Sequence, residues 1–167
     1  MRKITAIIFT ACAAFALGAC NQQQEAAPQA EVKPQVAPVP TNPTDKTAWK
    51  QYLVSVVTAN MQGVKTNHPY MYFVPGGDDD AAKADRQNQL DNVKNVVARG
   101  VLPGNMMAFG GPESKTTADL IVASFADAQA GSFKDVVVLF IGAPGDVDAV
   151  KQALTSSGAE VRFVEAK

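Results

Sequence analysis

The sequence predicts a small α/β protein with a single layered sandwich, in which a mainly parallel, four-stranded sheet packs with about four helices. From residue 44 onward, stretches with the 3.6-residue spacing of an amphipathic helix alternate with short apolar stretches. One of these, residues 136–141 (VVVLFI), is apolar throughout, which is typical of a strand buried on both faces of a parallel sheet. The chain of 167 residues has room for one such domain.

Four helices are expected, each with one apolar face. Their predicted ranges are Asp45–Gln62, Asp79–Arg99, Ser114–Ala128 and Asp146–Ser156. Thr44 is expected to cap the first helix, because it follows Pro43 and its hydroxyl can accept from free backbone N–H groups. Gly63, Gly100 and Gly158 are expected to end three of the helices, because glycine readily adopts the left-handed conformation found there.

Four strands are expected between and after these helices. Their predicted ranges are Tyr70–Val74, Met106–Phe109, Val136–Ile141 and Glu160–Val164. The third should be central, and the fourth alternates between polar and apolar residues as an edge strand does. Right-handed crossovers between parallel strands are expected to place helices on both faces of the sheet, with the first helix closing one side.

The first twenty residues have the pattern of an export signal. Arg2 and Lys3 precede an uncharged, mostly apolar run of 14 residues, Ile4–Leu17. About 20 residues are needed to span a bilayer, so this run suits a signal peptide better than a membrane span or a buried core helix. Residues 14–16 (AFA) would fit ordinary signal peptidase, whereas the run also ends in Leu17-Gly18-Ala19-Cys20.

These last four residues resemble the lipobox of bacterial lipoproteins. The resemblance implies that Cys20 receives a diacylglycerol on its sulfur and becomes the first residue of the mature chain. Two or more acyl chains would then hold the protein in the membrane, since each buried CH₂ contributes about 0.8 kcal/mol. Asn21, where an aspartate would imply retention at the inner membrane, favours the outer membrane of a Gram-negative envelope, facing the periplasm.

The chain is therefore expected to have three parts. Residues 1–19 are the lipoprotein signal peptide, residues 20–46 are the lipidated cysteine with a tether, and residues 47–167 are the globular α/β domain. Residues 21–46 hold five prolines and five glutamines but no aromatic residue, so they should form a proline-stiffened spacer. Without Arg2 and Lys3, 13 basic residues remain against 16 acidic ones, a mature charge of −3.

Three strand-to-helix turns of similar composition are candidates for a ligand site. They contain Gly76-Gly77, Gly110-Gly111 and Gly142 with Gly145, and all should lie at the carboxyl edge of the sheet, where open α/β sheets bind ligands at a switch in strand order. The candidate ligand-binding residues are Gly110, Gly111, Ser114, Thr116, Gly142 and Gly145, with Thr117 as a further hydroxyl at the same helix N-terminus. The alternative interpretation is that these glycines only permit tight turns.

Few groups for catalysis, metals or cofactors are present. The chain has two cysteines and one histidine, and residues 109–116 lack both glycines of a phosphate-binding loop. Asp78-Asp79-Asp80 lacks the ligand spacing of a calcium loop and is expected to be a solvated first helical turn. His68 precedes Pro69 without a recognisable partner. The sequence therefore assigns no catalytic residue, metal or cofactor, and its near-neutral charge gives no support for nucleic-acid binding.

The favoured hypothesis is a non-enzymatic envelope lipoprotein whose domain binds an envelope protein or a cell-wall component. Two alternatives stay open. One is a small-ligand or anion binder, or a minor enzyme, at the glycine-rich edge of the sheet. The other is an exported inhibitor or immunity lipoprotein that neutralises an incoming toxin.

Overall fold

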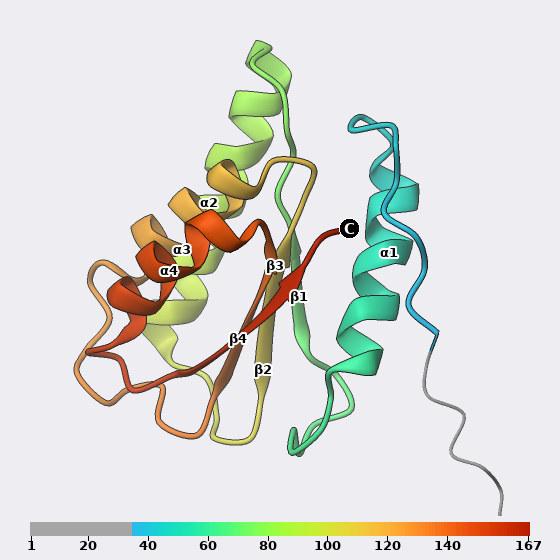
Figure 1. Cartoon of the computed structure of the whole chain (residues 1–167). Helices are drawn as coiled ribbons and strands as arrows, with labels where there is room; N and C mark the ends of the chain where they lie inside the picture. Colours follow the sequence, from blue (N-terminus) through green and yellow to red (C-terminus); the bar gives the residue numbers. More distant parts are fainter. Residues whose placement is uncertain (1–34) are drawn as a thin grey trace, which may run out of the picture. The chain divides into compact units, whose positions relative to one another are not determined.

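Helices and strands alternate along residues 35–167, the part of the chain that the computed structural model describes (Figure 1). The elements are α1 (Lys46–Ala59), β1 (Tyr70–Phe73), α2 (Asp80–Arg99), β2 (Met106–Gly110), α3 (Ser114–Phe125), β3 (Val137–Gly142), the short 3₁₀ helix η1 (Pro144–Asp146), α4 (Val147–Leu154) and β4 (Glu160–Glu165). This order confirms the predicted α/β class. The signal peptide, Cys20 and residues 21–34 of the predicted tether lie outside the described residues.

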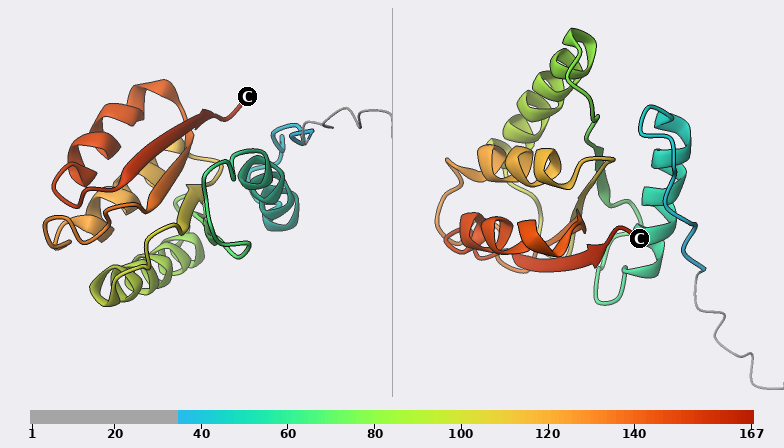
Figure 2. Two further views of the ribbon diagram at one scale, coloured as in Figure 1. Left: turned by 90° about the horizontal axis from the view of Figure 1, so that it is seen from below. Right: turned by 45° about the horizontal axis from the view of Figure 1, so that its top comes forward.

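The four strands form one parallel sheet in the order β1-β2-β3-β4. Each crossover adds the next strand in the same direction, so α2, α3 and α4 all lie on one face, and α1 lies on the other (Figures 1 and 2). The expectation that the crossovers themselves would put helices on both faces was wrong. That arrangement needs a reversal of strand order, and this sheet has none.

The two faces of the sheet follow the two-residue alternation of each strand. In β2, Met107 and Phe109 face the three-helix layer, whereas Met106 and Ala108 face α1. All six residues of β3 are buried, which confirms its predicted central position. In the sheet formed by residues 35–167, β4 pairs only with β3 and is an edge strand, as predicted.

Helix α1 begins one residue later than the sequence suggested. Its N-cap is Asp45, whose side chain accepts from the backbone N–H groups of Thr47 and Ala48 at 3.1 and 2.9 Å. Thr44 instead donates its hydroxyl to Asn42 Oδ1, so the predicted cap at Thr44 was wrong. The buried face of the helix consists of Trp49, Tyr52, Leu53, Val56 and Val57, which is the predicted apolar stripe.

The end of the predicted tether is in contact with the domain. The Ala37 N–H donates to Ser55 Oγ at 3.0 Å, and the Trp49 ring N–H donates to the Asn42 carbonyl at 3.2 Å. Ala37 and Val39 are partly buried against the α1 side of the core. Residues 35–45 thus pack beside α1 and extend the layer that this helix forms. Within residues 35–167, no helix has the length and apolar character needed to cross a membrane.

Candidate functional site

The three glycine-containing turns meet at the carboxyl edge of the sheet, and the backbones there approach very closely. A Cβ atom on Gly111 would lie 2.0 Å from the Val74 carbonyl oxygen. A Cβ on Gly110 would lie 2.5 Å from Leu53 Cδ2, and one on Gly142 would lie 2.6 Å from Ser114 Oγ. These positions have no room for a side chain, so their glycines have a packing role whether or not a ligand binds nearby.

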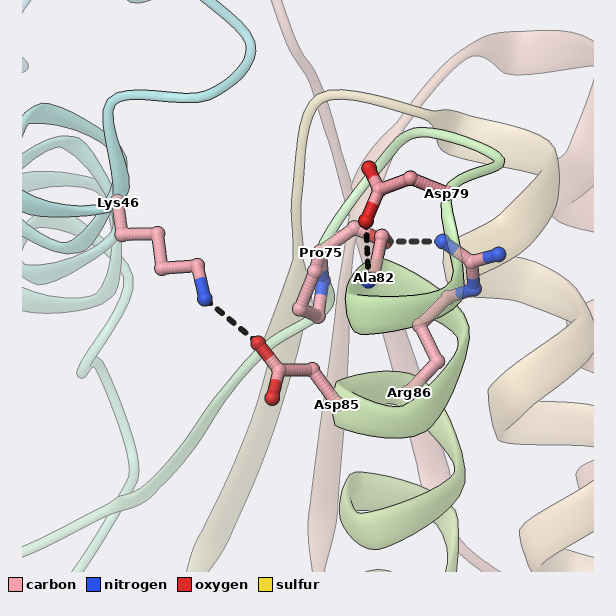
Figure 3. A network of polar contacts seen from close by, with 6 residues as sticks. All are labelled: Lys46, Pro75, Asp79, Ala82, Asp85 and Arg86. Atoms are coloured by element: carbon pink, nitrogen blue, oxygen red, sulfur yellow. Dashed lines mark hydrogen bonds and ion pairs between the residues drawn. The ribbon is translucent and has the colours of Figure 1, made fainter.

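A carboxylate joins the first turn to the second. Glu113 Oε1 accepts from the Gly77 backbone N–H at 2.7 Å, and Glu113 Oε2 accepts from the Thr116 hydroxyl at 2.8 Å. The Gly77 N–H, followed by the Thr116 hydroxyl, lowers the pKa of Glu113. Arg86 adds to this effect and also donates to the Pro75 carbonyl at 3.1 Å (Figure 3) and to the Gly77 carbonyl at 2.6 Å. The ends of β1, α2 and α3 are therefore connected through one polar cluster.

A second set of hydrogen bonds joins the second turn to the third. The Ser114 hydroxyl donates to Asp146 Oδ2 at 2.5 Å and accepts from the Ala143 backbone N–H at 2.6 Å. Thr117 is buried, and its hydroxyl donates to the Glu113 carbonyl at 3.0 Å. All three hydroxyls that were candidates for anion binding at the start of α3 therefore have partners within the fold.

The start of α3 already has negative charge beside it. A helix N-terminus favours anions because its first N–H groups are free and its dipole is positive there. Glu113 and Asp146 place two carboxylates next to the hydroxyls of Thr116 and Ser114. These carboxylates would repel an external anion, so the local electrostatics disfavour the binding of phosphate or sulfate.

A hollow of about 430 Å³ lies at this edge of the sheet. It is lined by Val39, Pro40, Thr41, Pro43, Trp49, Gly111, Pro112, Ser114, Gly142, Ala143 and Ala166. The structure thus brings three of the six candidate residues to one hollow: Gly111, Ser114 and Gly142. The rest of its lining comes from the packed N-terminal segment, Trp49, Pro112, Ala143 and Ala166.

The other three candidate residues lie elsewhere. Gly110 is buried against Leu53. Thr116 lines a separate hollow of about 310 Å³ between α2 and α3. Gly145 lies in η1 with no atom within 4 Å of an added Cβ. Since the strand order does not reverse, the crevice that a switch in strand order would open is not formed by residues 35–167.

The aspartate run contributes the cap of a helix, and the lone histidine lies exposed in a loop. Asp79 caps α2, because its side chain accepts from the Ala82 N–H at 2.9 Å, and this bond is the main cause that lowers the Asp79 pKa (Figure 3). His68 is exposed in the loop before β1, with its backbone N–H donated to Thr66 Oγ1. Among residues 35–167, no three His, Cys, Asp or Glu side chains cluster as metal ligands would.

A larger hollow, of about 670 Å³, lies beside β1 and was not predicted from the sequence. We call it the β1 groove; it is lined by Lys46, Lys50, Leu53 and Val54 of α1, by Met71, Tyr72, Phe73 and Pro75 of β1 and the turn after it, and by Asp85, Asn88, Gln89 and Asn92 of α2. The available signal was the absence of charge from residues 70–74 (YMYFV), which is unusual for a strand at a sheet edge.

An ion pair crosses the β1 groove at one end. Lys46 Nζ on α1 lies 2.6 Å from Asp85 Oδ2 on α2 (Figure 3). Their side chains are 56% and 45% exposed, so the pair contributes at most about 1 kcal/mol to stability. Its main effect is therefore positional, since it links the two helices that flank β1.

Comparisons of the chain with protein-family models, with curated proteins and with solved structures give no match.

The close approach at Gly111 makes a sharp prediction about stability. Gly111→Ala should lower the free energy of unfolding by about 3 kcal/mol, because the new methyl group meets a backbone carbonyl that cannot move aside. Gly145→Ala is the matched control: its Cβ meets no atom within 4 Å, so stability should be unchanged or raised by up to about 1 kcal/mol. Urea unfolding of the full chain measures both, and equal effects would contradict the packing role of Gly111.

The hydrogen bonds to Glu113 predict how its contribution depends on pH. Because folding lowers this pKa, the ionised side chain stabilises the fold above the ordinary value of 4.5, and the contribution disappears as pH falls through the folded-state pKa. The wild-type chain should therefore be more stable than Glu113→Gln at neutral pH, with a difference that narrows on acidification. Urea unfolding at several pH values tests this; a difference that stays constant or widens on acidification would contradict it.

Proposed function

We propose that the protein is a membrane-anchored envelope lipoprotein whose α/β domain acts as a non-enzymatic binding module. The anchor is inferred from the lipobox at Leu17-Gly18-Ala19-Cys20. The partner is a protein or cell-wall component of the envelope, and the location that Asn21 favours is the outer membrane, facing the periplasm. In this proposal an inhibitor or immunity protein is the same kind of module with a toxin as its partner.

The observation that supports a binding role over a catalytic one is that the polar groups at the carboxyl edge are hydrogen-bonded within the fold. Ser114 is hydrogen-bonded to Asp146 and Ala143, and Glu113 is hydrogen-bonded to Gly77 and Thr116. A nucleophile or a general base needs a free hydroxyl or carboxylate that faces a substrate. Here the corresponding groups hold the three turns together, which supports a structural role for the edge that most often carries chemistry in α/β proteins.

The packed N-terminal segment restricts where the domain would sit. Because residues 35–45 lie on the domain, only residues 21–34 separate Cys20 from it. Even fully extended, 14 residues span no more than about 50 Å. The proposed anchor would thus keep the domain close to the membrane, within reach of membrane proteins and of the adjoining cell wall.

A second candidate function is favoured by the hollow beside Trp49, in which Gly111, Ser114 and Gly142 come together. Trp49 is the single tryptophan, so its fluorescence reports directly on this place. With inorganic phosphate as the probe, we expect no saturable change, because Asp146 and Glu113 disfavour an anion there. A saturable change that Ser114→Ala abolishes would favour the anion-binding function instead.

The anchor makes a separate prediction. Cys20→Ser should leave the precursor unlipidated and abolish incorporation of radiolabelled palmitate. The urea unfolding midpoint of the domain should not change, because the substituted side chain is expected to carry only the lipid. In a Gram-negative host, Asn21→Asp is the matched variant: it should keep the label but move the protein to the inner-membrane fraction. Label that persists in Cys20→Ser would overturn the lipobox assignment.

The binding role is tested by chemical crosslinking in intact envelopes, followed by purification of the full chain. The expected result is a stoichiometric protein or peptidoglycan adduct that requires the anchored form. Turnover of a substrate by the purified chain, abolished by a single substitution at the carboxyl edge, would overturn the proposal. The identity of the adduct then separates a resident envelope component from an incoming toxin.

A further inference from the structure

The two edges of the sheet differ in how they are protected. β4 and the residues after it include Glu160, Arg162, Glu165 and Lys167, and Arg162 donates to the carbonyl groups of residues 60 and 62. Charges of this kind prevent a sheet edge from pairing with another strand. β1 has no charged residue, and its Tyr70 and Met71 side chains are 42% and 44% exposed. The unprotected edge is therefore the one that forms the floor of the β1 groove.

The backbone of β1 has hydrogen-bonding groups that face the groove. The Val74 N–H donates to the Gly110 carbonyl, so Val74 directs its N–H toward β2. In an extended strand, alternate residues direct their N–H and C=O groups to opposite sides. Met71 and Phe73 therefore direct theirs away from β2, and β2 is the only strand paired with β1 in the sheet formed by residues 35–167.

The two walls of the β1 groove suit an extended chain. Leu53 and Val54 provide an apolar wall from α1, and Val54 is 47% exposed. Asn88, Gln89 and Asn92 provide a wall of side-chain amides from α2. An amide can both donate and accept, so this wall can bond to the backbone of an added strand on the side away from the apolar wall. The groove thus combines main-chain pairing with two different side-chain environments.

The charge of the groove indicates which sequence would fit. Its charged lining residues are Lys46, Lys50 and Asp85. Lys46 and Asp85 form the ion pair across one end, whereas Lys50 has no ion-pair partner among residues 35–167. The unbalanced charge is therefore positive, and an acidic side chain in the bound segment would complement it.

We propose that the β1 groove binds an extended, acidic segment of a partner protein by strand addition, in which the segment pairs with Met71 and Phe73 and places a carboxylate at Lys50. This deepens the proposed function and rests on it, since it names the surface and the chemistry of the module's partner. A second copy of this chain fits less well, because its own β1 carries a helix on each face, and the space beyond β1 is already flanked by α1 and α2.

The test uses the full-length chain in detergent micelles and a phage-displayed library of random decapeptides. Peptides selected on the wild-type chain are synthesised, and their binding is measured by calorimetry. Met71→Pro removes one outward N–H and sets a proline where an edge strand tolerates it. Met71→Thr is its matched control, because it changes the same side chain but keeps the N–H. Lys50→Glu, at an exposed position, tests the charge independently of the strand.

The expected consensus is an alternating sequence with an acidic residue. Met71→Pro should weaken its binding about tenfold, by loss of a backbone hydrogen bond, whereas Met71→Thr should change it much less. Lys50→Glu should weaken it about threefold and, in a new selection, favour basic peptides. An absence of selected peptides, or binding that is equal in Met71→Pro and Met71→Thr, overturns the proposal. So does a selection with no preference for charge.

Two other occupants are outcomes of the same experiment. A wild-type chain that is dimeric by sedimentation, with a monomeric Met71→Pro variant, would assign the groove to a second copy. A synthetic peptide of residues 21–34 that binds the chain and is weakened by Met71→Pro would assign it to the chain's own N-terminal segment. Either result overturns the assignment to a partner protein. The proposed function fails separately, by loss of the envelope adduct or by persistence of acyl label in Cys20→Ser.

Discussion

One face of the sheet has to be buried by a single helix, and much of the structure depends on how this is achieved. Because the strand order does not reverse, α2, α3 and α4 all cover the opposite face. Without α1, the other face of β3 would expose Leu139 and Ile141 to solvent. Trp49, Leu53 and Val56 of α1 cover this face. Burial of each such large apolar side chain contributes about 1.5–3 kcal/mol, so the position of α1 is strongly determined. One helix is nevertheless narrower than four strands.

The rest of that layer comes from both ends of the described chain. On the β4 side, Ala37 and Val39 of the N-terminal segment and Ala166 after β4 pack beside α1. On the β1 side no segment of residues 35–167 is added in this way, and the β1 groove lies there between α1 and α2. Leu53 lines this groove, and its side chain also fills the space where a Cβ atom on Gly110 would lie. The position of α1 therefore shapes both the groove and the carboxyl edge of the sheet. Both hollows therefore result from the way α1 packs on this face of the sheet.

The sequence allowed the elements to be predicted because their signals are local. Gly100 ends α2 with a φ of 77°, as predicted. The predicted roles of Gly63 and Gly158 were wrong, because α1 ends at Ala59 and α4 ends at Leu154, each a few residues before its glycine. The strand order could not be predicted, since it depends on pairings between distant segments that no local pattern records. The same limit explains why the N-cap of the first helix was predicted at the wrong residue. Thr44 and Asp45 are both good caps, and only the path of the preceding chain selects Asp45.

The candidate site was predictable in part, for a physical reason. Parallel strands bring their carboxyl ends to one edge, so Gly111, Ser114 and Gly142 do meet at one hollow. Thr116 does not join them, because residues two apart on a helix point to nearly opposite sides. The hydrogen bonds that Gly77 donates to Glu113 and that Ser114 donates to Asp146 join residues 36 and 32 positions apart, and only the folded structure reveals them.

The contrast between the two edges of the sheet raises the question of how a chain with an uncharged edge strand avoids indiscriminate pairing with other strands. β1 has four residues, so few backbone groups, those of Met71 and Phe73, face outward. Pairing through so few hydrogen bonds is weak by itself, which limits indiscriminate association with other strands. Strong binding at this edge therefore requires contacts with both helical walls, and those walls differ. One is apolar and carries Lys50, which has no ion-pair partner among residues 35–167, and the other carries the side-chain amides of α2. Selectivity would then come from the helices, while β1 supplies only the direction and register of the bound segment.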